Sequence, residues 1–231
     1  MFFVVKKTGK REKTMAIKII LADDHAVLRH GLSKSFQNEK DMEVIAQARD
    51  GRTTVQLVKE LVPDVVIMDI GMPDLNGIEA TRQVKQECPR VKVIALSMHS
   101  SKNFIIEMFR AGASGYLLKD CEFDELVNAI RVVINNKTYI SPAISDVVVE
   151  TSMLRSGSEK DSAFTVLSKR EREVLQLLTE GRTTKQIAKR LHISSKTVEV
   201  HRLNIMSKLK IDSIAQLTKY AIQQGLTLPE P

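Results

Sequence analysis

Short apolar runs alternate with helical patterns between residues 17 and 135 of the chain. The runs have the length of strands, and their continuous hydrophobicity is typical of parallel strands buried on both faces. Between them, apolar residues recur every three or four positions, which indicates amphipathic helices. We therefore predict an α/β fold, a doubly wound five-stranded parallel sheet with helices on both faces. The expected strands are 17–22, 42–48, 65–68, 91–96 and 114–118, and the expected helices are 27–36, 54–61, 77–86, 103–109 and 123–134.

Residues 165–231 follow a different pattern, which predicts an all-α domain of four helices. Ser168 and Thr183 each stand three residues before a Glu or a Gln, the spacing of a capping box at the start of a helix. Gly181, between them, is a typical helix terminator. Short helices joined by a tight turn make this domain a helix-turn-helix candidate. An ordinary helical hairpin has the same pattern and remains the alternative.

The two patterned regions define a domain organisation. We expect one domain over 17–136 and a second over 165–231, joined by a linker, 137–164, that is rich in serine and charge. Residues 1–16 are basic, follow no helical or strand period, and are expected to form a disordered leader.

Composition adds information mainly through the distribution of charge. The net charge of +7 divides into +4 for residues 1–16, −3 for 17–164 and +6 for 165–231. A basic domain joined to a mildly acidic one is typical of a nucleic-acid-binding module fused to a domain with another function. Apolar runs stay well below the roughly 18 residues that span a bilayer, so we expect no membrane contact and a cytoplasmic location. The two cysteines, Cys88 and Cys121, are expected to be free thiols without a function.

Acidic residues follow two of the expected strands at their carboxyl ends. Asp23 and Asp24 come directly after the first strand, and Asp69 comes directly after the third. In an open parallel sheet these strand ends meet at one crevice, where ligands bind. Three carboxylates at one rim repel each other, and Mg²⁺, which prefers oxygen ligands and phosphate, would relieve that repulsion. The alternative is that these acids are solvated loop residues.

Residues 17–135 resemble the receiver domain of bacterial two-component response regulators, and residues 165–228 resemble the LuxR-type helix-turn-helix. The order of the two parts matches the NarL/FixJ class. The motif residues that carry the receiver resemblance are Asp23, Asp24, Asp69, Pro73, Gly77, Ser97, Tyr116 and Lys119. One departure is Asp120, which stands where many receivers have a proline after the lysine.

The resemblance implies roles for these residues. Asp69 would be the phosphoacceptor, phosphorylated by a partner sensor histidine kinase. Mg²⁺ would be held by Asp23, Asp24, Asp69 and the Gly71 carbonyl. Lys119 and Ser97 would stabilise the phosphoryl group, and Tyr116 could turn inward when Ser97 moves. No enzymatic turnover is expected beyond the receiver's own phosphoryl transfer and slow dephosphorylation.

The LuxR resemblance implies binding to double-stranded DNA by a homodimer that regulates transcription. The recognition helix would place its early turns in the major groove. Glu199 and Val200 are candidates for base contacts, and the basic side chains are candidates for phosphate contacts. The full set of candidate DNA-binding residues is Thr184, Lys185, Lys196, Thr197, Glu199, Val200, Arg202, Leu203 and Lys208.

Two other functions fit parts of the sequence. A haloacid-dehalogenase-like phosphatase also uses an Asp nucleophile with Mg²⁺, but this chain has Gly71 where that family has a second Asp. A quorum-type regulator would bind a small acyl signal, but the amino-terminal half carries acidic strand ends instead of an aromatic-rich pocket. Turnover of a small phosphate ester, or stoichiometric binding of an acyl signal, would favour these alternatives.

Overall fold

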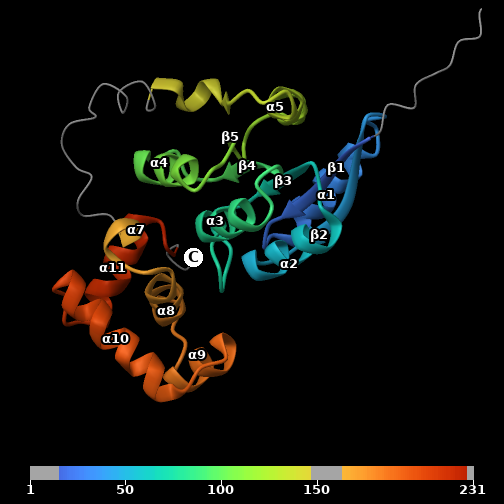
Figure 1. Ribbon diagram of the computed structural model, residues 1–231. Coiled ribbons are helices and arrows are strands. Elements are labelled where there is room, and N and C mark those ends of the chain that lie inside the picture. The colour runs from blue at the N-terminus through green and yellow to red at the C-terminus, as the bar shows by residue number, and fades with distance from the viewer. Residues whose placement is uncertain (1–15, 147–162, 228–231) are drawn as a thin grey trace, which may run out of the picture.

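A computed structural model describes residues 16–146 and 163–227 of the chain, which form an α/β domain followed by a helical domain (Figure 1). Nearly all of the expected leader, and the larger part of the expected linker, lie outside the described residues. Within the described ranges, no helix combines the length and the apolar character that a membrane crossing requires.

The amino-terminal domain is built on one parallel sheet with the strand order β2-β1-β3-β4-β5-β6. The first three strands match their predicted ranges residue for residue. All five predicted strands are present, and a sixth, short strand pairs with β5 inside the expected linker. Two residues are too few to show a period of two, so this strand leaves no hydrophobic pattern in the sequence. The strands are β1 Ile17–Ala22, β2 Met42–Ala48, β3 Val65–Met68, β4 Lys92–Ser97, β5 Gly115–Leu118 and β6 Tyr139–Ile140.

Helices cover both faces of this sheet, as the doubly wound pattern predicts (Figure 1). Alternate side chains of each strand point to opposite faces. Ile20, Val66 and Val93 pack in one cluster with α2, α3 and α4, whereas Ile19 and Ile67 pack in a second cluster with α1 and α5. The helices are α1 Ala26–Phe36, α2 Gly51–Leu61, α3 Gly77–Glu87, α4 Lys102–Arg110 and α5 Phe123–Ile134, followed by the short 3₁₀ helix η1 Pro142–Ile144.

The carboxyl-terminal domain contains the four predicted helices, preceded by one short helical turn. Both predicted capping boxes are formed, at Ser168 and at Thr183. His192, in the left-handed conformation, ends one helix, and Ser194 caps the next through the Thr197 amide, so the helix-turn-helix geometry is present. The elements are α7 Ala163–Val166, α8 Lys169–Thr179, α9 Thr184–Leu191, α10 Ser195–Leu209 and α11 Ile214–Gln224.

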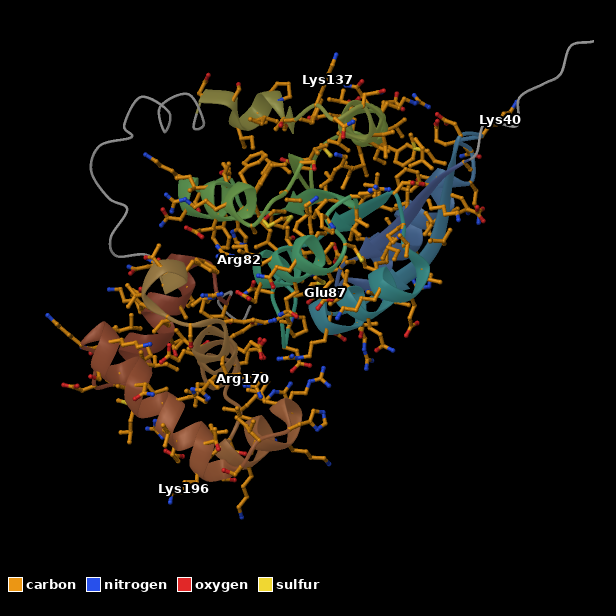
Figure 2. All side chains as sticks on the ribbon, viewed as in Figure 1. Lys40, Arg82, Glu87, Lys137, Arg170 and Lys196 are labelled. Atoms are coloured by element: carbon orange, nitrogen blue, oxygen red, sulfur yellow. The ribbon has the colours of Figure 1, made fainter. Side chains whose placement is uncertain are left out.

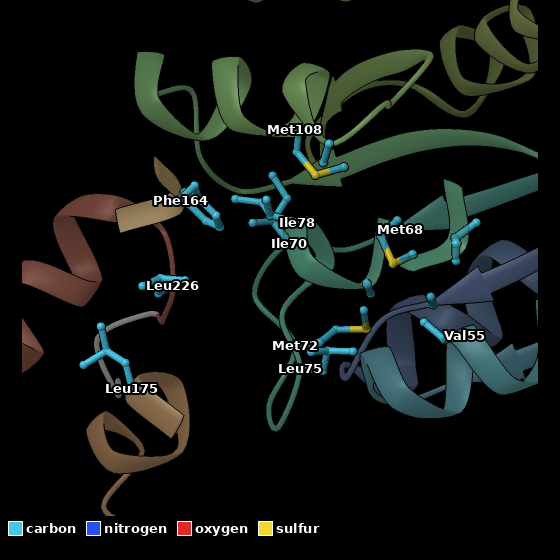
Figure 3. Close-up of a cluster of buried hydrophobic side chains, with 14 of the residues drawn as sticks. Val55, Met68, Ile70, Met72, Leu75, Ile78, Met108, Phe164, Leu175 and Leu226 are labelled. Atoms are coloured by element: carbon cyan, nitrogen blue, oxygen red, sulfur yellow. The ribbon is translucent and has the colours of Figure 1, made fainter. Parts of the chain in front are cut away.

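The two domains share one apolar cluster. Phe164, Leu175 and Leu226 of the helical domain face Met72 and Ile78 of the α/β domain in Figure 3, and all of them belong to the same group of buried residues. Burial of apolar side chains on both sides of the junction favours docking of the domains. The loop between β3 and α3 therefore lies at the domain junction as well as at the end of β3.

Candidate functional site

Three carboxylates meet at the carboxyl edge of the sheet. Asp23 and Asp24 directly follow β1, and Asp69 directly follows β3, whose backbone is paired with β1. The Asp69 amide continues that pairing by donating to the Ala22 carbonyl at 2.7 Å. A ligand atom from each of these acids, and one from His25, lie within 4.8 Å of one another. The sequence prediction that these acids converge is therefore confirmed.

Lys119 brings a positive charge to the same edge. It follows β5, and its amide donates to the Ser97 carbonyl at 2.8 Å, which extends the pairing with β4. Its Nζ lies 2.8 Å from Asp23 Oδ2 and 2.9 Å from Asp69 Oδ2. All three side chains are nearly fully buried, so these ion pairs are poorly screened by solvent.

The cluster contains more carboxylate groups than ammonium groups, so its negative charge is only partly neutralised. Burial and the neighbouring Asp23 raise the pKa of Asp69 and Lys119 lowers it, and the net result is a pKa of about 6. Burial alone would lower the pKa of Lys119, but Asp69 and Asp23 outweigh it and the pKa is raised. One ammonium group thus faces more than one carboxylate. A divalent cation with oxygen ligands fits this donor set, and the exposed Asp24 completes it from the solvent side.

The loop after Asp69, residues 70–76, is fixed closely against the site. The Gly71 amide donates to Asp69 Oδ1 at 3.3 Å, and the Gly77 amide donates to the Ile70 carbonyl at 2.9 Å. A Cβ at Gly77 would lie 2.0 Å from the Asp69 carbonyl oxygen, so only glycine fits there. The sequence motif thus includes a residue whose role is steric.

Ser97 and Tyr116 lie together beside the acids. The Ser97 hydroxyl is fully buried and accepts from the His99 amide at 3.0 Å. Tyr116 is also fully buried, and its hydroxyl donates to the His99 carbonyl at 2.6 Å. The role of Tyr116 as a side chain that turns inward when Ser97 moves stays a prediction. In this structure the ring is buried, and the His99 backbone bonds to both hydroxyl groups.

The candidate DNA-binding residues lie on α9 and α10. α10 is on the side of the helical domain away from the sheet (Figure 1), whereas α9 contacts the receiver through the ion pair between Arg190 and Asp74. Val200 and Leu203 are 49% and 65% exposed, which is unusual for large apolar side chains. Lys196 projects outward at the far end of the domain (Figure 2). Val198 and Ile205, on the inward side of α10, are fully buried.

Two candidates for DNA contact have partners within the domain. Glu199 accepts from the Thr184 hydroxyl at 2.7 Å and lies 4.0 Å from Arg202. Lys208 Nζ lies 2.7 Å from the buried Glu171, which belongs to the capping box of α8. Lys208 therefore stabilises the contact between α10 and α8, and a phosphate contact would have to compete with that ion pair.

Comparisons with known proteins agree with this geometry. A family model described as "Response regulator receiver domain" matches residues 19–131, and one described as "Bacterial regulatory proteins, luxR family" matches residues 165–221. The transcriptional regulatory protein DegU of Brevibacillus brevis is 37% identical over 222 residues, which cover 90% of this chain and 94% of DegU. The chain is a LuxR-type response regulator.

Other relatives of this response regulator match either most of the chain or a shorter part of it. The oxygen regulatory protein NreC of Staphylococcus carnosus is 38% identical over 214 residues, which cover 91% of this chain and 99% of NreC. Among solved structures, a LuxR-family response regulator of Aurantimonas matches with a TM-score of 0.57 and 33% identity, over 60% of this chain and 99% of that one. The Salmonella typhimurium response regulator RcsB matches with a TM-score of 0.55 and 25% identity, over 89% and 98%.

Sequence reasoning missed one member of the acidic site of this response regulator. His25 Nδ1 lies 2.8 Å from Asp24 Oδ1 and 3.1 Å from Asp23 Oδ1. The signal was available, because His25 directly follows the acidic pair and imidazole is a common metal ligand. The prediction considered only carboxylates and a carbonyl, since those are the usual ligands of Mg²⁺.

Proposed function

We propose that Asp69 of this response regulator accepts a phosphoryl group from a sensor histidine kinase and that phosphorylation controls binding of the helical domain to double-stranded DNA. The observation that carries the proposal is the buried Asp69 carboxylate, 2.9 Å from Lys119 Nζ and beside two further acids. An Asp69 oxygen would form a bond to phosphorus while the P–N bond of the kinase phosphohistidine breaks, and the electron pair returns to the imidazole. Later attack by water would release phosphate and restore Asp69.

Mg²⁺ is the cofactor that we propose for this transfer. Asp23, Asp24, Asp69 and the Gly71 carbonyl would hold the ion, which supplies positive charge next to the phosphoryl oxygens. Lys119 would bind a phosphoryl oxygen from the other side, and the Ser97 hydroxyl would donate to another. The chain's own catalysis would be limited to this transfer and to slow hydrolysis.

The helical domain would use α10 as the recognition helix. Val200 and Leu203 offer apolar contacts to bases, and Lys196, Thr197 and Arg202 offer contacts to the backbone of the duplex. Thr184 and Lys185, at the amino end of α9, would add phosphate contacts. Glu199 would reach a base only by leaving Thr184. Lys208 would reach a phosphate only by leaving Glu171.

We propose a homodimer on inverted half-sites, acting in transcription in the cytoplasm. The response regulator RcsB, which is 25% identical to this chain, is known in a structure of two dimers bound to two parallel DNAs. A dimer with two-fold symmetry would match half-sites related by the same symmetry. Each copy would then contribute one recognition helix.

Labelling with a small phosphodonor tests the site. Asp69→Asn should abolish acid-labile phosphate after incubation with phosphoramidate and Mg²⁺, because the amide is not a nucleophile. Asp120→Asn, an exposed acid near the site, is the matched control and should label like the wild type. Undiminished labelling of the Asp69 variant would refute the assignment.

Footprinting with and without phosphoramidate tests whether phosphorylation controls DNA binding. We expect protection of an inverted repeat at lower protein concentration after phosphorylation, and no such gain for Asp69→Asn. Steady turnover of a small phosphate ester would instead support the phosphatase alternative. Stoichiometric binding of an acyl signal by the unphosphorylated chain would support the quorum-type alternative.

A further inference from the structure

His25 begins helix α1 without capping it. It occupies the N-cap position with an extended backbone, φ −77° and ψ 101°, but its side chain makes no capping hydrogen bond. Serine, threonine, aspartate and asparagine are the residues that usually stabilise this position. The start of the helix therefore does not account for the imidazole ring, which lies instead against the two acids that precede it.

Hydrogen bonds fix the turn that carries Asp23, Asp24 and His25. The His25 amide donates to Asp23 Oδ1 at 2.8 Å. Arg29 Nη1, one turn further along α1, donates to the Asp23 carbonyl. The His25 side chain is 67% exposed, so the ring can rotate while its backbone stays in place. The imidazole is thus held on the same short segment as two of the three acids.

Lys119 and His25 contact different oxygens of Asp23. Lys119 Nζ lies 2.8 Å from Asp23 Oδ2, and His25 Nδ1 lies 3.1 Å from Asp23 Oδ1. On Asp69, Lys119 likewise contacts Oδ2, at 2.9 Å. The ammonium group and the imidazole therefore do not compete for one oxygen of Asp23, and they approach its carboxylate at separate atoms.

The distances around His25 match those between ligands of one metal ion. Ligand atoms about 2.1 Å from an ion lie about 3.0 Å apart when they are adjacent and about 4.2 Å apart when they are opposite. His25 Nδ1 lies 2.8 Å from Asp24 Oδ1 and 3.1 Å from Asp23 Oδ1, which are separations of adjacent ligands. One ligand atom from each of the three acids and from His25 lies within 4.8 Å of the others, so a small contraction would bring all four around one ion.

An imidazole ligand changes which ion a site prefers. Mg²⁺ favours oxygen ligands and gives up its water reluctantly. Imidazole nitrogen suits the later first-row ions, whose affinity for such sites rises from Mn²⁺ to Co²⁺ and Ni²⁺. The alternative is an ordinary ion pair between His25 and Asp24, which contributes little at an exposed position and does not depend on the kind of metal.

We propose that His25 Nδ1 is a nitrogen ligand of the divalent cation at the acidic site, and that this ligand makes the site favour Co²⁺ and similar late first-row ions over Mg²⁺. The inference rests on the proposed function, which supplies the ion. A ligating Nδ1 carries no proton, so the neutral ring keeps its proton on Nε2. The contact between His25 and Asp24 is then replaced by binding of both side chains to the ion. Mg²⁺ remains usable, because the inference concerns relative affinity.

Calorimetric titration of the full-length protein with Co²⁺ and with Mg²⁺ measures this preference. The two ions have similar radii, so the ratio of their affinities reports mainly on ligand chemistry. We expect His25→Ala to lower the preference for Co²⁺ roughly tenfold. His30→Ala is the matched control, because His30 is an exposed histidine of the same helix whose Nδ1 contacts the Ala26 carbonyl at 2.7 Å. Excess Mg²⁺ should displace the Co²⁺ bound at the site, which distinguishes it from Co²⁺ bound to other histidines.

Pulsed electron paramagnetic resonance of bound Mn²⁺ detects the nitrogen directly. The wild type and His30→Ala should show the ¹⁴N coupling of a directly bound imidazole, and His25→Ala should lose it. His25→Gln is the second variant, since its side chain can still bond to Asp24 but offers only an oxygen to the metal. It should lose the coupling as well, which separates a metal ligand from a hydrogen-bond partner.

Two results would overturn the nitrogen ligand. The ratio of Co²⁺ to Mg²⁺ affinity could be the same in all four proteins, or the ¹⁴N coupling could persist in the His25 variants. Either result leaves the proposed function standing if the wild type is still labelled by phosphoramidate with Mg²⁺. If the wild type binds neither ion and takes no label, the proposed function is wrong and this inference falls with it.

Discussion

Asp69 carries an energetic cost in the absence of metal, and this can be measured. Its pKa is raised from 3.8 to about 6 by burial. A carboxyl group with a higher pKa in the folded state binds protons more tightly there, so the free energy of unfolding falls as the pH rises between these two values. We expect Asp69→Asn to increase this free energy by about 1–3 kcal/mol near pH 7.5 in EDTA. The gain should shrink toward pH 4.5, where Asp69 is mostly protonated.

Urea unfolding at the two pH values provides the measurement. Asp24→Asn is the control, because this carboxylate is partly exposed and its replacement should have a smaller effect. Added Mg²⁺ should stabilise the wild type more than the Asp69 variant, since binding to the folded state raises its stability. A metal-free Asp69→Asn protein that is less stable than the wild type near pH 7.5 would contradict the explanation.

At the scale of elements, the sequence predicted strands and helices correctly where burial produces a run or a period of hydrophobic residues. β3 is a continuous apolar run and β1 and β2 are mostly apolar, and the ends of β1 and β3 place Asp23, Asp24 and Asp69 together. The sequence also predicted both capping boxes, because these depend on local spacing.

Prediction failed where polar groups are buried against another domain. Arg172, Gln176 and Glu180 have the spacing of a solvated helix face, and only the docked receiver shows that they bind Asn76, Glu79 and Asp74. The hydrogen-bond partners of Ser97 and Tyr116 were also out of reach, because they are backbone groups of His99 that carry no sequence signal.

The recognition helix should contribute to DNA affinity through charge. Lys196 is exposed at the first turn of α10 and points away from the rest of the protein (Figure 2). A lysine that contacts one phosphate releases counterions on binding, so Lys196→Ala should reduce the slope of log K against log salt by about 0.9. Affinity should fall by a similar factor for different operator sequences, because phosphate contacts carry no base specificity.

Lys40→Ala is the matched control for this measurement. It removes the same charge from an exposed position in the receiver, far from α10 (Figure 2). Fluorescence anisotropy with labelled duplex at several salt concentrations gives both slopes. Equal slopes for the two variants would show that Lys196 acts only through the net charge of the protein.

At the scale of the whole molecule, residues 70–76 contact both the acidic site and the helical domain, so this loop can couple two binding equilibria. Site occupation should favour the undocked form, and so should an inverted repeat that holds two helical domains in a symmetric pair. Linkage then requires that beryllofluoride, a phosphoryl analogue, raise the affinity for DNA by the same factor by which DNA raises the affinity for beryllofluoride. Gly225→Ala should bring both factors toward one, because its methyl group would press on Phe104 of the receiver and free the domain, whereas Gly181→Ala, which faces open space, should leave them unchanged. Titrating each ligand in the presence and absence of the other measures both factors, and a marked inequality between them would rule out equilibrium coupling of this kind.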